Sequence, residues 1–107
     1  MQYFRMQFPT EAKPKVVAKS GERDVIVISE NAIIVEAKGV PQYNIGASVG
    51  GEIYYPNGEK DLLQGYIVFI KGNQVIVKLL KGISLQRMNE QVLWVRKNFP
   101  YFDMKMK

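Results

Sequence analysis

The feature that most constrains this chain is a change in the spacing of its apolar residues at Gly82. Before Gly82, apolar residues stand in short, β-branched runs, which are typical of strands. After Gly82 they recur three and four residues apart, a spacing that places them on one face of a helix. The sequence therefore predicts a mainly β chain with one helix at its carboxyl end.

The strand signals favour a small closed barrel. Turn residues separate the apolar runs and supply the positive φ angles that tight hairpins need. Short strands at this spacing favour a closed or nearly closed antiparallel barrel of about six strands over residues 10–82. The runs are Val25–Ile28, Ile33–Val35, Tyr66–Ile70 and Val75–Val77, and the turns are Ser20-Gly21, Pro56-Asn57-Gly58 and Gly72-Asn73.

The helix is expected over residues 84–98, with Ser84 as its N-cap and Pro100 as its stop. Its apolar stripe is expected to be buried against the barrel. The stripe consists of Leu85, Met88, Val92, Val95 and Phe99. Residues 101–107 are expected to form a basic tail.

One aromatic residue falls outside this stripe. At 100° per residue, Trp94 lies on the side of the helix that carries Arg87. Tryptophan and arginine are enriched in binding hot spots. We expect the barrel to leave this side of the helix uncovered. Arg87 and Trp94 are therefore candidates for a partner surface, for an acidic protein or a second copy of the chain. The alternative is that Trp94 covers a barrel end or packs under the tail.

Composition bears mainly on catalysis. The chain has 107 residues, enough for one domain, and contains no histidine and no cysteine. It thus lacks the commonest general base and any thiolate metal ligand. No phosphate loop before a helix and no nucleophile motif is present. We expect no enzyme activity, no metal and no cofactor.

Positive charge is concentrated in the last third of the chain. The net charge is +5, and eight lysines and arginines stand against two acids from Lys71 onward. Such an asymmetry indicates either an anionic partner or a solvated basic face. No apolar h-region follows Met1 to Arg5, and no apolar run approaches the length of a membrane span. We expect a cytoplasmic protein without a membrane span.

Three segments carry a resemblance to a known family. They are Tyr3-Phe4-Arg5-Met6 with Phe8-Pro9, then Ile28-Ser29-Glu30-Asn31-Ala32-Ile33, then Leu80-Lys81-Gly82-Ile83-Ser84-Leu85 with Met88, Glu90-Gln91 and Phe99-Pro100. In order and spacing they resemble the PilZ family of cyclic di-GMP effector domains. The resemblance implies a single domain over residues 1–107, a six-stranded antiparallel PilZ-type barrel with a C-terminal helix and a flexible segment over residues 1–9.

PilZ domains bind cyclic di-GMP through an R-x-x-x-R motif on the amino-terminal segment and a D-x-S-x-x-G motif on the barrel. Arginine offers a planar fork for phosphate or guanine, aspartate accepts from guanine N–H groups, and glycine allows close approach. The resemblance assigns Arg5 to the second arginine and Ser29 to the serine. These two residues are the candidate cyclic di-GMP ligands.

Three of the five motif positions differ. Met1 stands four residues before Arg5, Val27 holds the aspartate position and Ala32 holds the glycine position. Losing an arginine and an aspartate removes contacts of roughly 1.5–3 kcal/mol each, which lowers affinity by about 10²- to 10⁴-fold. Asp24 lies three residues before Val27 and is expected on the opposite strand face. We expect weak or absent cyclic di-GMP binding.

Three functions remain open. The leading hypothesis is a PilZ-like adaptor in cyclic di-GMP-linked pathways that binds a protein partner. Val27 completes an apolar run on both faces of its strand, which suggests that the former ligand surface is packed or covered. The second hypothesis is a cyclic di-GMP receptor that uses Arg5 and Ser29. Nucleic-acid binding is less favoured, because Tyr54, Tyr55 and Tyr66 do not alternate with lysine or arginine.

Overall fold

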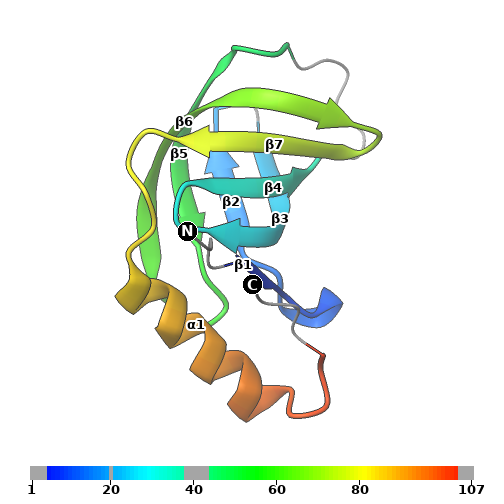
Figure 1. The fold of residues 1–107 in the computed structure, drawn as a ribbon, viewed down its shortest axis with the longest axis vertical. Helices are drawn as coiled ribbons and strands as arrows, with labels where there is room; N and C mark the ends of the chain where they lie inside the picture. Colours follow the sequence, from blue (N-terminus) through cyan, green and yellow to red (C-terminus); the bar gives the residue numbers. More distant parts are fainter. Residues whose placement is uncertain (1–4, 20, 38–43, 104–107) are drawn as a thin grey trace.

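The computed structural model describes residues 5–19, 21–37 and 44–103 (Figure 1). These residues form seven strands and one α-helix. In chain order the elements are β1 (Arg5–Gln7), a 3-10 turn (Thr10–Ala12), β2 (Lys15–Ala18), β3 (Gly21–Ser29), β4 (Ala32–Glu36), β5 (Ser48–Tyr54), β6 (Lys60–Lys71), β7 (Gln74–Leu79) and α1 (Leu85–Asn98).

The strands close into a barrel. The sheet order is β1-β3-β2-β5-β6-β7-β4, every pairing is antiparallel, and β3 also pairs with β4. Strands β2 to β7 therefore form a closed six-stranded barrel, and β1 is one strand beyond it. The sequence prediction of a six-stranded antiparallel barrel with one C-terminal helix is confirmed.

The amino-terminal segment differs from expectation where the structure describes it. Residues 5–7 pair with β3 as strand β1, and the side chains of Met6 and Phe8 are buried in the core. The expected flexible segment is therefore wrong for residues 5–9, because these apolar side chains hold the segment against the barrel. Residues 1–4 lie outside the described part.

Gly82, where the apolar spacing changes, lies against the β3–β4 turn. A Cβ atom at Gly82 would overlap the carbonyl oxygen of Glu30, so no larger residue fits there without a shift of the backbone. The next amide, Ile83 N, donates to the same oxygen at 2.9 Å. This contact fixes where the chain leaves the barrel and begins the helix.

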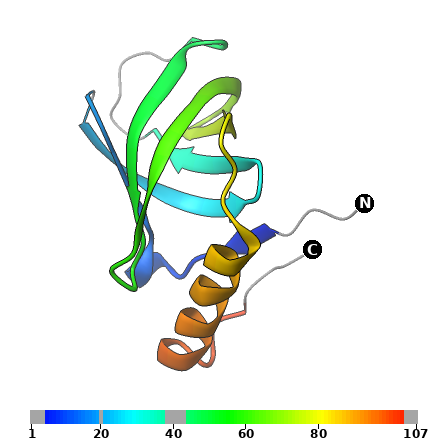
Figure 2. The ribbon, with the colours of Figure 1, turned by 90° about the vertical axis from the view of Figure 1, so that its left-hand side faces the viewer.

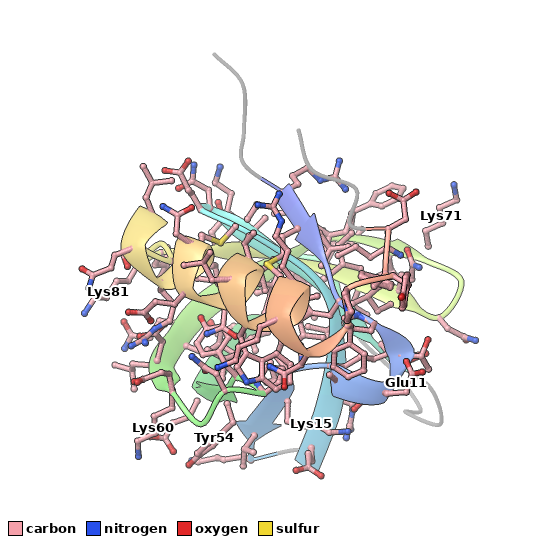
Figure 3. The ribbon with its side chains drawn as sticks, turned by 90° about the horizontal axis from the view of Figure 1, so that it is seen from below. Glu11, Lys15, Tyr54, Lys60, Lys71 and Lys81 are labelled. Carbon is pink, nitrogen blue, oxygen red and sulfur yellow. The ribbon has the colours of Figure 1, made fainter. Side chains whose placement is uncertain are left out.

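Helix α1 lies across one end of the barrel (Figures 2 and 3). Ser84 is its N-cap, as predicted, and the Ser84 hydroxyl accepts from Arg87 N at 3.1 Å. Three residues of the predicted stripe, Met88, Val92 and Val95, are buried in the core. The large side chains of Met6, Ile28 and Ile33 belong to the same core cluster.

Two helix residues differ from the expected stripe. Leu85 is 52% exposed, whereas Gln91 is fully buried. The buried arc starts one turn later, at Met88, and includes Gln91, whose Nε2 donates to Asn57 Oδ1 at 3.0 Å. The turn after β5 thus gives Gln91 Nε2 an acceptor, whereas Gln91 Oε1 is buried without a partner among the described residues.

The end of the chain is described as far as residue 103. Tyr101 is exposed and Phe102 packs partly against the core, so the expected tail is not wholly solvated. Residues 104–107 lie outside the described part. No helix among the described residues is both long and apolar enough to span a bilayer.

Replacing Val92 by Ala should lower the free energy of unfolding by about 1–3 kcal/mol, because it removes two methyl groups from a packed interface. Leu93 is the matched control: it is 66% exposed on the same helix, and Leu93→Ala should change stability by no more than about 0.5 kcal/mol. Urea melts followed by circular dichroism measure both. Equal midpoints would contradict the burial of this helix face.

Candidate binding surface

A row of apolar side chains crosses the outer face of four neighbouring strands. Direct pairing links Val27 of β3 to Ile34 of β4, Ile34 to Ile76 of β7, and Ile76 to Phe69 of β6. Such pairs place their side chains on one face of the sheet, about 5 Å apart. Ile34 and Ile76 each stand between two buried residues and therefore point outward. These four residues are called the outer apolar row.

Two irregularities of register make the row continuous. One lies between Val25 and Val27 in β3, and the other between Ile67 and Phe69 in β6. In a regular strand, residues two apart share a face, and both Val25 and Ile67 are buried. One extra residue in each strand turns Val27 and Phe69 to the outside. Phe69 is 49% exposed and Val27 is half-buried.

The same irregularity corrects the expected position of Asp24. Without it, Asp24 and Val27, three residues apart, would lie on opposite faces of β3. With the extra residue both face outward, so the expectation that Asp24 faces away from Val27 is wrong. The carboxylate of Asp24 is paired with Lys15 of the neighbouring strand β2.

A second row runs beside the first, on the side nearer the helix. It consists of Arg5, Ser29, Ala32, Lys78 and Tyr66, joined by strand pairing and by the side-chain hydrogen bonds of Ser29. This set is called the basic row, because it contains two cations and no acid. The outer apolar row therefore has two cations on this side, whereas on its other side lie the acids Asp24 and Glu36, which are paired with Lys15 and Lys13.

The structure brings the two candidate ligand residues together. Arg5 is the direct strand partner of Ser29, and Arg5 is exposed. The Ser29 hydroxyl donates to Ala32 O at 2.9 Å and accepts from Ala32 N at 3.1 Å. It therefore closes the β3–β4 turn, and a ligand would have to compete with these two bonds.

Arg87 is not on an uncovered side of the helix. Its guanidinium lies 3.1 Å from Asp61 Oδ2, 2.8 Å from Glu90 Oε1 and 3.2 Å from Glu59 Oε1, and its side chain is 19% exposed. It also lies 5.6 Å from the centre of the Tyr55 ring. The expectation that the barrel leaves this side free is wrong for Arg87, which attaches α1 to the β5–β6 turn.

Tyr55 and Arg87 share the carboxylate of Asp61. The Tyr55 hydroxyl donates to Asp61 Oδ2 at 2.9 Å. Burial and this hydrogen bond raise the pKa of Tyr55 well above its usual range, and the bond to Asp61 raises the pKa of Arg87. Tyr55 is therefore an uncharged hydrogen-bond donor at neutral pH. Its ring is buried, so it offers no face on which a nucleic-acid base could stack.

Trp94 is only half-buried. It packs against the core, and its ring lies 5.9 Å from that of Phe99. Trp94 therefore contributes to packing at the carboxyl end of the helix, which matches the alternative that it covers a barrel end. Its use in partner binding stays a prediction.

The sequence interpretation missed three residues of the outer apolar row: Ile34, Phe69 and Ile76. The signal was present, because Ile33–Val35 and Val75–Val77 are apolar at every position and not only at alternate ones. A strand of that kind is apolar on both faces. Phe69 lies in the equally continuous run Tyr66–Ile70, but which residues of that run face outward depends on the extra residue in β6.

Comparison of the chain with family models, curated proteins and solved structures gives no match. The resemblance to PilZ domains therefore rests on the three segments of the sequence and stays a prediction. Among the described residues, no group of three or more carboxylates is arranged to hold a metal ion.

Replacing Arg87 by Met should lower the free energy of unfolding by about 2–4 kcal/mol, because three acids lose their shared cation. Arg87→Lys should lower the free energy of unfolding by an intermediate amount, since lysine keeps the charge but lacks the planar fork. Arg96→Met is the control: Arg96 is exposed on the same helix and should change stability by no more than about 0.5 kcal/mol. Urea melts at low salt compare the three variants. A loss for Arg87→Met no larger than for the control would contradict the attachment role.

Proposed function

We propose that this chain is a non-enzymatic, PilZ-like adaptor domain in cyclic di-GMP-linked signalling. Its outer apolar row binds an acidic protein partner, and it binds cyclic di-GMP weakly or not at all. The observation that carries the proposal is the position of Val27. This residue holds the place of the family's aspartate and stands in a row of four outward apolar side chains.

The surface suits a protein partner better than solvent. Exposed apolar residues scattered over a protein surface need no explanation, whereas a contiguous row indicates an interaction site. The basic row beside it and the net charge of the chain indicate the sign of the partner's charge. Arg5 and Lys78 lie in the adjacent basic row, and the whole chain carries +5. A second copy would carry the same net charge of +5, so an acidic partner is favoured over self-association.

A residual cyclic di-GMP site is the second candidate, and the pairing of Arg5 with Ser29 favours it. Two features oppose it. Val27 provides no acceptor for a guanine N–H group, and the Ser29 hydroxyl is already bonded to Ala32. The expected dissociation constant for cyclic di-GMP is therefore weaker than about 10 μM.

Isothermal calorimetry of the chain with cyclic di-GMP tests the ligand. We expect heats too small to fit a constant below about 10 μM. If weak binding is measured, Val27→Asp combined with Ala32→Gly should strengthen it, because an acceptor is restored and the backbone becomes accessible. A sub-micromolar isotherm that Arg5→Ala abolishes would establish the receptor function instead.

The partner surface is tested with one variant of the outer apolar row and one of the basic row. Tagged wild-type chain should retain an acidic protein from a lysate of its native cells. Phe69→Ser and Lys78→Glu should each weaken that complex about tenfold or more, measured by titrating the purified partner. Val17→Ser and Lys97→Glu are the controls: both residues are exposed outside the two rows, and neither change should weaken binding more than about twofold.

Two results would contradict this assignment. One is a purified partner that binds all four variants as tightly as the wild-type chain. The other is a dimer of the chain alone, seen by analytical ultracentrifugation, that Phe69→Ser converts to a monomer. That second result would make the outer apolar row a surface for self-association.

A further inference from the structure

The barrel holds a cavity of about 530 Å³ at the end away from α1. Residues at the end of β2, the beginning of β3 and the beginning of β5 line it, and Figure 2 shows these segments at the end of the barrel away from α1. Its inner wall is formed by buried side chains, among them Val35, Val75 and Val77. A cavity of this size lies within the range of small-molecule binding sites, about 300–1,000 Å³.

The cavity follows from the sizes of the side chains at the two ends of the barrel. A small barrel is normally filled by its own inward side chains. At the helix end the core contains large residues, including Met6, Ile28 and Ile33. At the other end the lining includes Ala18, Gly21, Ala47, Val49 and Gly50. These small residues leave the space unfilled, although the barrel itself is closed.

The lining carries positive charge. Lys19 and Arg23 belong to it, and none of the described lining residues is an acid. The guanidinium of Arg23 lies close to Gly21, where a Cβ atom would be 2.9 Å from Arg23 Nη1. Arg23 Nη1 also donates to the carbonyl of Glu22 at 2.7 Å. Arg23 thus has a defined position at the β2–β3 hairpin, beside an apolar interior.

We propose that this cavity binds a medium-chain carboxylate, with its alkyl chain among the valine and alanine side chains and its carboxylate beside Lys19 and Arg23. An apolar chain gains from leaving water in proportion to the area that it buries. The anionic end would remain near the mouth, where a guanidinium offers charge-assisted hydrogen bonds. The site lies inside the barrel, so it does not depend on the outer apolar row.

Calorimetric titration with hexanoate, octanoate and decanoate tests whether the apolar part of the cavity holds an alkyl chain. Each added methylene group should strengthen binding about fourfold while the chain still fits. Equal affinity for the three acids, or no binding by any of them, would overturn the proposal. Octanol serves as the uncharged counterpart of octanoate and should bind about tenfold more weakly or worse. Equal binding of the two would refute the role of the cations.

Variants of the lining residues test whether the ligand binds in the cavity. Val49→Phe and Ala18→Leu each add an apolar side chain inside it and should abolish octanoate binding while circular dichroism shows an intact fold. If one of the two variants fails to fold, octanoate binding by the other one tests the proposal. Arg23→Gln should weaken octanoate about tenfold and leave octanol unchanged, whereas Arg96→Gln on the helix should change neither. Octanoate bound equally well by a folded cavity-filling variant would show that it binds elsewhere.

Discussion

Strand β3 is paired along both of its edges, and the rest of the molecule is arranged around that constraint. Strands β2 and β1 share one edge and β4 takes the other, so β3 closes the barrel. The pairing of β3 with β4 shifts register between Val25 and Val27, where β3 accommodates one extra residue. That irregularity decides which side chains of β3 enter the core and which face outward.

The fold was predictable where local pattern and tertiary packing agree. The β-branched runs, the turn residues and the 3–4 spacing after Gly82 each gave an element that the structure contains. Prediction failed where the position of a side chain depends on a residue that is far away in the sequence. Gln91 is buried because Asn57 accepts its hydrogen bond, and Met6 forms part of the core because β3 offers an edge to β1. Neither partner is adjacent in the sequence.

The candidate surface was predictable only in part, for the same reason. Arg5 and Ser29 were found by motif and do lie side by side. The outward position of Val27 and Phe69 depends on strand register, which alternation alone does not reveal. The side of the helix that carries Arg87 was wrongly expected to be uncovered, because helical periodicity gives an angle on the helix but not the reach of a long side chain. Its guanidinium extends to Asp61 across the interface.

The position of α1 also has a consequence for synthesis. Chains leave the ribosome amino end first, at about 5–20 residues per second, so all strands of the barrel emerge before the helix that covers its end. In that interval the large side chains at this end, including Met6, Ile28 and Ile33, have no cover. Until the helix docks, the nascent barrel has an exposed apolar end of the kind that chaperones bind.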